Sequence, residues 1–203
     1  MLPRVLVLSN RGNMIKDAIE ASNCDFAVVS ADYPVEMWPD SDWVVSFGYR
    51  KLIPEYLIEK YRGQIINIHM SLLPLNRGAH PNFWSWFDNT LRGVTIHRVH
   101  PLLDAGEILA QQKLDHGLMS DFRQPATLTT TYNDLLVAAT GLFDRSWKDI
   151  LRGQAVLPKP LAIKPSYHRA SDIDRFFNML SCGWDAPVRE VSQLGQLYRG
   201  ESI

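Results

Sequence analysis

Four short, mainly apolar runs divide the first 69 residues, and turns or stretches with helical spacing lie between them. The runs are Val5–Leu8, Phe26–Val29, Trp43–Phe47 and Gln64–His69. Runs that do not alternate regularly with polar residues are typical of strands buried on both faces. Strands and helices that follow one another with short connections form parallel sheets covered by helices. The pattern therefore predicts an α/β fold with a mostly parallel, twisted sheet flanked by helices.

The remainder of the chain mixes further strands with longer helices. Alternating or apolar stretches predict strands over residues 93–99 and 107–112, and helical spacing predicts helices over 81–89 and 127–151. Gly153 follows the long helix, and three prolines after it predict an extended connector: Pro158, Pro160 and Pro165.

A short helical tail follows this connector. The sequence Ser171-Asp172-Ile173-Asp174 resembles a capping box, so a helix should run from it to about Leu180. A second helix is predicted over residues 188–198. We therefore expect a catalytic domain over residues 1–153. Residues 154–203 should form a connector and a small helical C-terminal extension, packed on the same domain or at an interface.

Charge and cysteine content exclude several classes of partner. The 21 Lys and Arg residues nearly balance 22 Asp and Glu, so we expect neither a nucleic-acid nor a membrane partner. Cys24 and Cys182 have no second Cys or His at metal-ligand spacing, so we expect no metal site. The run Val5–Leu8 is too short for a signal peptide or a membrane span. A soluble cytoplasmic protein fits all three observations.

Three polar residues form a set suited to acyl transfer. Asn67 and His69 are two residues apart on a predicted strand, so their side chains face the same side of the sheet. Asp104 lies in a turn between two predicted strands and could fold back toward them. An amide and an imidazole can stabilise a developing oxyanion, and an imidazole with a carboxylate can move the protons that amine acylation releases.

Each of these residues taken alone also has an ordinary structural role open to it. An Asn near a strand end often forms a turn, and a strand His is often a hydrogen-bonded structural residue. An Asp before Ala-Gly is a common turn residue. The residues by themselves therefore leave the catalytic and structural interpretations open.

Three segments in the same order resemble the 10-formyltetrahydrofolate-dependent formyltransferase family. Asn67-Ile68-His69-Met70-Ser71-Leu72-Leu73-Pro74 resembles the family segment N-x-H-x-S-L-L-P. Gly93-Val94-Thr95-Ile96-His97 resembles G-V-T-x-H, and Asp104-Ala105-Gly106-Glu107-Ile108-Leu109 resembles D-x-G-x-I-[IL]. The resemblance covers about residues 43–112. It departs from the common family pattern at Met70, where Pro is frequent, and at Ala105, where Thr is frequent.

The resemblance implies a Rossmann-like formyltransferase fold with a shortened N-terminal half. It also implies that Asn67, His69 and Asp104 are the catalytic residues and that 10-formyltetrahydrofolate is the formyl donor. The short N-terminal half is most similar to compact sugar N-formyltransferases and to the formylation domain of nonribosomal peptide synthetases. The expected reaction is therefore formyl transfer to the primary amine of an amino-sugar nucleotide.

Other functions stay open at this stage. The acceptor could be another amine, such as glycinamide ribonucleotide or a carrier-bound aminoacyl group. A hydrolase that removes the formyl group from the folate is a further alternative. A catalytically dead module that binds folate or a nucleotide sugar is the non-enzyme alternative, although all three residues of the catalytic set are present. The aromatic tail is compatible with a homodimer.

The resemblance also implies which residues bind the two substrates. The loop after the third strand and the turn before Asp104 should hold the folate, through Phe47, Gly48, Tyr49, Leu52, Ile53, Leu73 and His100. Core packing is the alternative role for the apolar members. Residues of the following loop and helix should bind the acceptor: Arg77, His80 and Trp84. The turn Ser9–Asn13 could bind a phosphate or simply cap a helix.

Overall fold

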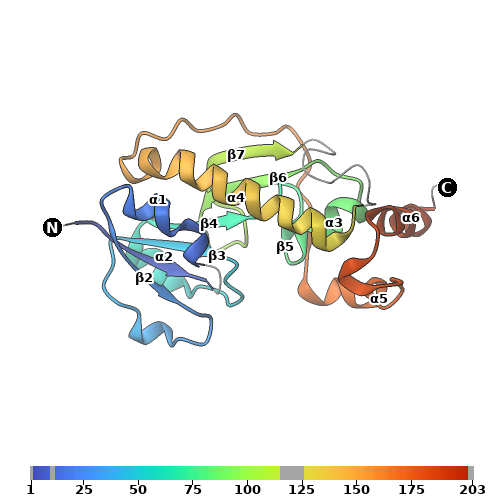
Figure 1. Cartoon of the computed structure of the whole chain (residues 1–203), viewed down its shortest axis with the longest axis horizontal. Helices are drawn as coiled ribbons and strands as arrows, with labels where there is room; N and C mark the ends of the chain where they lie inside the picture. The colour runs from blue at the N-terminus through green and yellow to red at the C-terminus, as the bar shows by residue number, and fades with distance from the viewer. Residues whose placement is uncertain (1, 10–11, 115–125, 201–203) are drawn as a thin grey trace. The chain divides into compact units, whose positions relative to one another are not determined.

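The computed structural model of the protein describes residues 2–9, 12–114 and 126–200. Its main element is a six-stranded sheet in the order β2-β1-β3-β4-β6-β7 (Figure 1). The first four of these strands by sequence pair in parallel, and β6 runs antiparallel to β4. The strands are β1 (Arg4–Leu8), β2 (Asp25–Val29), β3 (Trp43–Phe47), β4 (Ile65–His69), β6 (Arg92–Arg98) and β7 (Ile108–Leu114).

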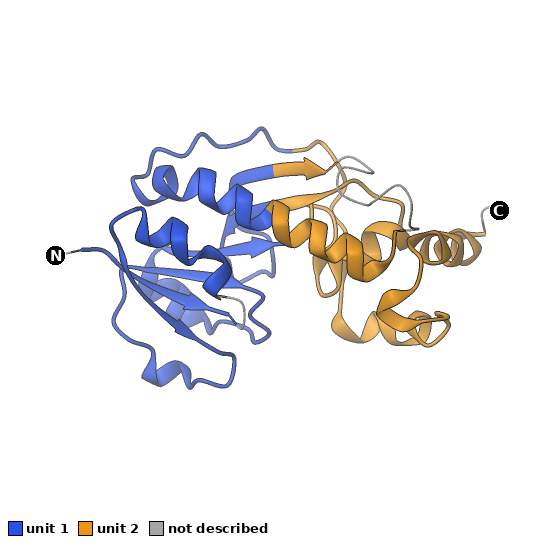
Figure 2. Cartoon of the chain, viewed as in Figure 1, with its two compact units in different colours: residues 1–69, 95–111, 139–160 blue, residues 70–94, 112–138, 161–203 orange. Residues whose placement is uncertain are grey.

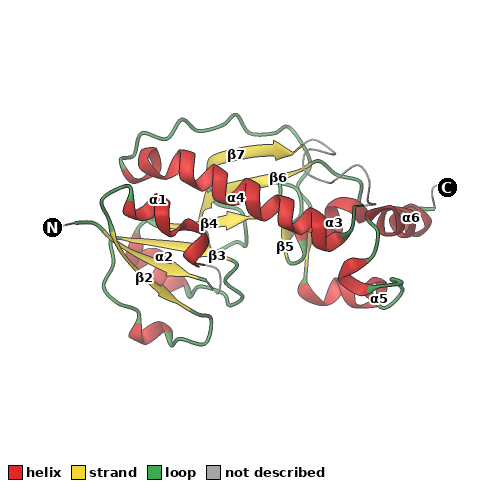
Figure 3. Ribbon diagram, viewed as in Figure 1, coloured by secondary structure: helices red, strands yellow, loops and turns green. Residues whose placement is uncertain are grey.

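Helices connect the strands and build the C-terminal part of the chain (Figure 3). The α-helices are α1 (Lys16–Glu20), α2 (Glu55–Tyr61), α3 (Pro81–Phe87), α4 (Leu128–Leu151), α5 (Asp174–Phe177) and α6 (Val188–Arg199). Short 3-10 turns are η1 (Gly12–Ile15), η2 (Val35–Met37), η3 (Ala170–Ile173) and η4 (Gly183–Asp185). A second, two-stranded sheet pairs β5 (Arg77–Gly78) with β8 (Tyr167–His168).

The chain divides into two compact units (Figure 2). The first comprises residues 1–69, 95–111 and 139–160, and the second comprises residues 70–94, 112–138 and 161–203. This division does not follow the predicted boundary at residue 153. The reason is that the chain returns after the connector as β8, which pairs with β5 in the second unit. The functional division into a catalytic domain and an extension stays a prediction.

Helices cover both faces of the sheet in the first unit. On one face Leu6, Leu8, Val44 and Ile65 pack with Leu57 and Tyr61 of α2. On the other face the Trp43 ring meets the Trp147 ring of α4 edge-on, with centroids 5.7 Å apart. A mostly parallel sheet covered in this way confirms the predicted α/β fold.

The second unit has a core of its own, rich in aromatic rings. It is built from α3, α5, α6 and the start of α4, through Phe83, Trp84, Phe87, Leu128, Ile173, Phe176, Val188 and Val191. Inside this core the Asn82 Nδ2 donates hydrogen bonds to the Leu128 carbonyl, at 2.9 Å, and to Thr131 Oγ1, at 3.1 Å. These bonds satisfy a buried amide and join α3 to α4.

The predicted capping box occurs two residues earlier than expected. The Asp172 carboxylate accepts a hydrogen bond from the Arg169 backbone N–H at 2.7 Å, so Asp172 is the third residue of η3 and Arg169 precedes the helix. Ser171 lies inside the 3-10 turn rather than before it. The prediction of Ser171 as the capping residue was therefore wrong, because the turn begins at Ala170.

In the described part of the chain, no helix combines the length and the apolar character needed to cross a membrane.

Candidate active site

Asn67 and His69 lie on one face of β4, which is apolar near the start of the strand and polar toward its end. Ile65 packs on α2 in the core of the first unit. Because side chains alternate along a strand, Asn67 and His69 share the face of Ile65, farther along β4. His69 is the last residue of β4 and is buried. Ligands bind in open α/β sheets near this carboxyl end of the strands.

A turn brings Asp104 to these residues from the opposite direction. β6 runs antiparallel to β4, so the last residue of β6 lies beside the first residues of β4. The Arg98 N–H donates to the Glu107 carbonyl at 2.9 Å and closes the loop between β6 and β7. Within this loop Asp104 is buried and has a φ of 48°. A buried non-glycine residue in the left-handed region is uncommon and often marks a functional position.

Asp104 is the centre of the resulting cluster. Its Oδ2 lies 3.7 Å from His69 Nδ1, and its Oδ1 lies 3.5 Å from Asn67 Nδ2. The same Oδ1 lies 3.4 Å from His97 Nε2. The structure therefore brings together the three residues predicted to be catalytic and adds His97 to them. Their roles in catalysis remain a proposal.

The sequence prediction did not give His97 a role in this site. His97 lies directly opposite Asn67 in the β4–β6 register, and its Nε2 is 3.2 Å from Asn67 Nδ2. The His69 and His97 rings meet edge-on, with centroids 6.3 Å apart. The alternation of residues 93–99 does indicate that Thr95 and His97 share a face. However, the antiparallel register that sets His97 beside Asn67 of β4 is not contained in the local sequence.

The hydrogen bonds of His97 define its neutral tautomer. Its Nδ1 lies 2.9 Å from the Arg98 carbonyl, which can only accept, so Nδ1 carries a proton. In the neutral ring Nε2 is then an acceptor for the Asn67 amide. In the protonated ring Nε2 would instead point a proton at the Asp104 carboxylate. His97 can therefore bind Asn67 or Asp104 according to its charge, and in the neutral state it holds the amide nitrogen of Asn67.

This geometry suits proton transfer to and from His69. His69 can accept or donate a proton, and a carboxylate 3.7 Å away stabilises the imidazolium that protonation forms. Because Asn67 directs its Nδ2 at His97 and Asp104, its amide oxygen is left to accept a hydrogen bond from a substrate. The expected role of the Asn67 amide in stabilising an oxyanion stays a prediction.

Most of the residues predicted to hold the folate follow β3 in the first unit. Phe47 is buried at the end of β3, and Gly48 follows it with a φ of 71°. Tyr49 and Ile53 pack against the apolar core beside α2. Leu52 is 76% exposed, so core packing is not its role.

The other two predicted folate residues lie elsewhere. His100 is exposed, and its Nδ1 accepts a hydrogen bond from the Leu102 N–H at 3.0 Å. Leu73 is buried in the second unit. Nothing in these positions tests folate binding itself, so the donor site stays a prediction.

The three residues predicted to bind the acceptor belong to the second unit. Arg77 is half-buried on β5, and its Nε has no hydrogen-bond partner among the described residues. The His80 ring stacks on Trp184 at 5.5 Å. Trp84 is 4% exposed and belongs to the aromatic core. Arg77 and His80 therefore have accessible surface, whereas Trp84 is almost wholly enclosed by protein.

The turn predicted over Ser9–Asn13 is described only in part, because residues 10 and 11 lie outside the described residues. Ser9 is buried, its N–H donates to the Val29 carbonyl at 2.9 Å, and its hydroxyl donates to the Phe47 carbonyl. Ser9 thus ties the end of β1 to the ends of β2 and β3.

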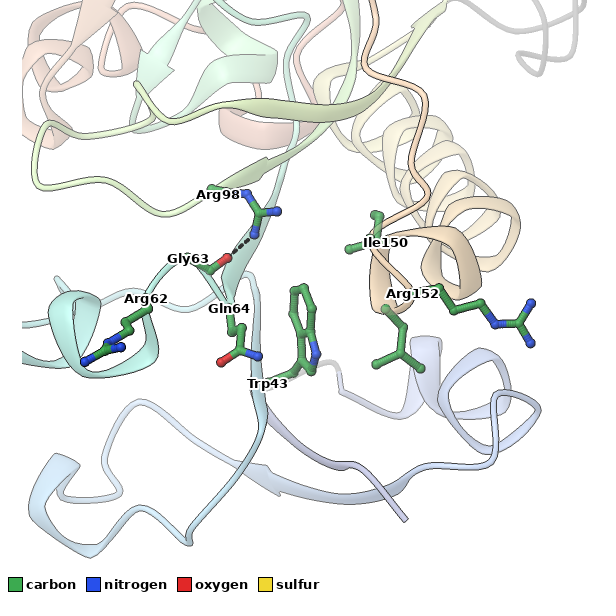
Figure 4. A pocket seen from close by; sticks show the side chains of 9 residues that line it. Trp43, Arg62, Gly63, Gln64, Arg98, Ile150 and Arg152 are labelled. Carbon is green, nitrogen blue, oxygen red and sulfur yellow. Dashed lines mark hydrogen bonds between the residues drawn. The ribbon is translucent and has the colours of Figure 1, made fainter. Parts of the chain in front are cut away.

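A pocket of about 600 Å³ opens where β3 and β4 begin, at the other end of these strands from His69 (Figure 4). The Arg98 guanidinium above it donates to the Gly63 carbonyl and lies 3.0 Å from the Glu107 carboxylate. Figure 4 shows Arg62 and Arg152 extending away from Trp43. Both follow the last residue of a helix, α2 or α4, where positive charge stabilises the carbonyl end. These arginines therefore have a structural explanation, and the pocket is not the candidate active site.

No three His, Cys, Asp or Glu side chains are grouped so that they could hold a metal ion within residues 2–9, 12–114 and 126–200. The cluster around Asp104 contains two imidazoles and one carboxylate, which are acid, base and hydrogen-bonding groups in their own right.

Known proteins resemble both the sequence and the fold. A family model described as formyl transferase matches residues 38–121, which include the whole cluster. The solved formyltransferase PseJ from Anoxybacillus kamchatkensis is 30% identical, with a TM-score of 0.83. The match covers 95% of this chain and 100% of that one. That structure was determined in complex with UDP-4,6-dideoxy-4-formamido-L-AltNAc and tetrahydrofolate.

Two more distant structures show the same fold. An N-formyltransferase from Helicobacter canadensis, in complex with folinic acid and dTDP-3-aminofucose, is 17% identical with a TM-score of 0.70. That match covers 100% of this chain and 84% of the other. Phosphoribosylglycinamide formyltransferase from Bacillus halodurans is 24% identical with a TM-score of 0.60. That match covers 73% of this chain and 95% of the other.

Proposed function

This chain belongs to the formyltransferase family, and we propose that it transfers a formyl group from 10-formyltetrahydrofolate to the primary amine of an amino-sugar nucleotide. The observation that carries the proposal is the buried cluster in which Asp104 lies within 3.7 Å of His69 and within 3.5 Å of Asn67. The identity of 30% to a formyltransferase solved with a UDP-linked formamido sugar favours a nucleotide sugar as acceptor.

The donor supplies the formyl group and is released as tetrahydrofolate, whose N10 gains a proton when its bond to the formyl carbon breaks, while the acceptor amine gives one up. The acceptor amine must lose its proton before it can attack, and the Asn67 amide oxygen is suited to orient it by accepting an N–H. His69 either donates to the formyl oxygen as negative charge develops there or takes the proton that the amine loses. Asp104 stabilises the protonated form of His69. In its neutral form His97 holds the Asn67 amide, and in its protonated form it holds the Asp104 carboxylate.

Exposed leucines on two loops of the first unit fit a flat heteroaromatic donor. Leu52, in the loop after β3, is 76% exposed. Leu102 and Leu103, just before Asp104, are 68% and 41% exposed. A ring system that covers such side chains removes apolar surface from water, and main-chain groups of the same loops can meet its polar edge. The residues present therefore fit a pterin ring.

Arg77 supports an acceptor that carries phosphate. Its Nε is buried and has no hydrogen-bond partner among the described residues. Arg77 as a whole is only half-buried, and a guanidinium offers paired, charge-assisted hydrogen bonds to phosphate oxygens. A nucleotide-linked sugar carries such oxygens at a distance from its reacting amine.

A homodimer is a further part of the proposal. The C-terminal extension leaves several large side chains exposed, among them Trp184 after α5 and Leu197 and Tyr198 on α6. Exposed apolar side chains in one segment favour an interface between copies. Analytical ultracentrifugation of the wild type and of Leu197→Glu would distinguish a dimer from a monomer.

The reaction can be tested with purified protein, 10-formyltetrahydrofolate and a panel of amines. Release of tetrahydrofolate is followed by its absorbance, and the formylated product by mass spectrometry. We expect a UDP- or dTDP-linked amino sugar to be the best acceptor, and glycinamide ribonucleotide and free amino acids to be poor. The His69→Ala protein serves as the control for non-enzymatic transfer. Tetrahydrofolate release that does not depend on an amine, with free formate as product, would instead indicate a hydrolase.

A further inference from the structure

The C-terminal extension contributes a strand to the loop that follows the proposed catalytic strand. β8 pairs in parallel with β5, with Tyr167 opposite Arg77 and His168 opposite Gly78. The Arg77 N–H donates to the Ser166 carbonyl and the Ala79 N–H to the His168 carbonyl, each at 3.0 Å. The loop over residues 74–79 is therefore held on one side by residues almost 90 positions later in the chain.

Further contacts show that the two segments are fitted closely. The Ser166 hydroxyl accepts a hydrogen bond from the Asn76 N–H at 2.8 Å. Gly78 has a φ of 88°, and a Cβ added to it would lie 2.2 Å from the His168 carbonyl oxygen. Only glycine permits that approach without a shift of the backbone. The pairing thus depends on the sequence of both segments.

The His168 side chain anchors β8 to α3. Its ring stacks on the Trp84 ring with centroids 3.9 Å apart and an angle of 4° between the planes. Its Nε2 lies 2.9 Å from the Asp88 carboxylate, as an ionic contact rather than an aligned hydrogen bond. Trp84 and Asp88 are four residues apart and so lie on the same face of the helix. The His168 imidazole therefore contacts both Trp84 within α3 and Asp88, the residue that directly follows it, while the His168 backbone holds β5.

We propose that His168 is a positioning residue for acceptor binding: it fixes the loop over residues 74–79 in the conformation that presents Arg77. The inference rests on the proposed function, because it assigns Arg77 to the acceptor. It adds that the C-terminal extension is part of the acceptor site, although no residue of the extension need touch the substrate.

The contacts indicate which step should depend on His168. The backbone N–H of Arg77 is bonded to Ser166, so loosening β8 changes where the Arg77 guanidinium lies. Asn67, His69 and Asp104 lie in the first unit, whereas Arg77, Trp84, Asp88 and His168 belong to the second. Loss of the anchor should therefore weaken acceptor binding and leave the chemical step almost unchanged.

Hydrogen exchange and steady-state kinetics test the proposal together. The variants are His168→Ala, which removes stacking and charge, His168→Phe, which retains a ring on Trp84, and Asp88→Asn, which removes only the ionic partner. Lys164→Ala is the control, because Lys164 is exposed and precedes the paired residues. We expect amides of residues 74–80 to exchange faster in His168→Ala, with partial recovery in His168→Phe and no change in Lys164→Ala.

In the kinetic arm, the acceptor KM should rise about tenfold in His168→Ala, the factor that corresponds to 1.4 kcal/mol of binding. The KM for 10-formyltetrahydrofolate and kcat should stay within about twofold of the wild type. The reason for the unchanged kcat is that the contact between Arg77 and the acceptor is made equally in the ground state and the transition state. His168→Phe should recover part of the acceptor affinity. If His168→Ala does not fold, Asp88→Asn carries the same test with a smaller expected effect.

Unchanged exchange in residues 74–80 would overturn the proposal, as would a lower kcat with an unchanged acceptor KM. The exchange measurement needs no substrate, so it is independent of the proposed reaction. If no amine in the panel were formylated by the wild type, the proposed function would fail. In that case faster exchange in His168→Ala would still establish the anchor, while its link to an acceptor would be lost.

Discussion

Asn67 on β4 and His97 on β6 lie directly opposite each other, and the Asn67 Nδ2 is 3.2 Å from the His97 Nε2. His97 in turn lies 3.4 Å from Asp104. One imidazole therefore contacts two of the three residues proposed to be catalytic, without being at the end of a strand itself. We therefore expect His97 to act as a positioning residue, whose loss should lower the rate of the chemical step.

We expect His97→Phe to lower kcat by up to about 10²-fold, the usual cost of displacing a catalytic group by roughly 1 Å. Phenylalanine fills the space of the buried ring but cannot bond to Asn67 or to the Arg98 carbonyl. His97→Gln, which retains polar atoms near Asn67, should recover part of the rate. Tetrahydrofolate release measures both. A kcat close to the wild-type value in His97→Phe would exclude this role.

His69 and Asp104 should each contribute at least about 10²-fold to turnover, the size of a lost acid–base or oxyanion contribution. His69→Ala and Asp104→Asn are the appropriate changes. Asn tolerates the left-handed backbone that Asp104 adopts, whereas Ala at the φ of 48° would add strain. Thermal unfolding should show that both variants fold. If Asp104→Asn kept near-normal kcat, the carboxylate charge would not be needed and the proposed mechanism would be wrong.

The sheet could be predicted from the sequence because its strands are marked locally. The apolar runs that begin at Val5, Phe26 and Trp43 are strands within one residue of the predicted bounds. The pairing of β5 with β8 could not be predicted. Each of these strands has two residues, with no periodicity to detect, and the bonds join Arg77 to a segment near Ser166.

The site was predictable to the extent that residues lie close in sequence or share a family segment. Asn67 and His69 share a face through the period of two along a strand. Asp104 reaches them because its loop folds back over the sheet. Gly106 permits this fold, since a Cβ there would lie 1.9 Å from the Arg98 carbonyl oxygen. The partnership of His97 with Asn67 depends on antiparallel register, which only the tertiary structure establishes.

The Tyr49 hydroxyl gives a prediction about stability at high pH. Burial raises the pKa of Tyr49 above its ordinary value, and its hydroxyl has no hydrogen-bond partner among the described residues. The folded state therefore retains this proton to a higher pH than the unfolded state, so stability falls as pH rises above about 10, the ordinary tyrosine pKa.

Tyr49→Phe should remove this part of the alkaline loss, and near neutral pH it should not lower the free energy of unfolding, because no hydrogen bond is broken. Urea unfolding at pH 7 and pH 10.5 would measure both effects. A clear loss of stability in Tyr49→Phe at pH 7 would show that the hydroxyl has a partner in solution.

Arg92 gives a prediction about stability at neutral pH. Its guanidinium lies 3.5 Å from the centroid of the Trp86 ring, and burial lowers its pKa to about 10 although Asp134 acts in the opposite direction. At pH 7 the side chain is still charged, so it depends on both neighbours.

We expect Trp86→Leu to cost about 1–2 kcal/mol of unfolding free energy through the lost cation–π contact. Asp134→Asn, which removes the favourable charge, should cost about 0.5–1 kcal/mol. Arg92→Met combined with Trp86→Leu should show less than the sum of the single effects, because the two side chains interact. Strictly additive losses would contradict the contact.

Arg77 provides the most direct test of the acceptor. Its Nε is buried without a hydrogen-bond partner among the described residues, and its backbone is bonded to Ser166. A contact with a phosphate far from the reacting amine is present in both the ground state and the transition state. Its loss should therefore raise KM and leave kcat unchanged.

Arg77→Ala should raise the KM for the nucleotide-sugar acceptor by about 10- to 100-fold, as expected for a charged hydrogen bond worth ~1.5–3 kcal/mol. Arg77→Lys should recover only part of this, because lysine restores the charge but not the paired donors of the guanidinium. Arg189→Ala is the control, since Arg189 is an exposed arginine of the same unit. The KM for 10-formyltetrahydrofolate should be unchanged in all three variants. An acceptor KM that stays at the wild-type value in Arg77→Ala would place the phosphate elsewhere, and a donor KM that rises with it would assign Arg77 to the folate instead.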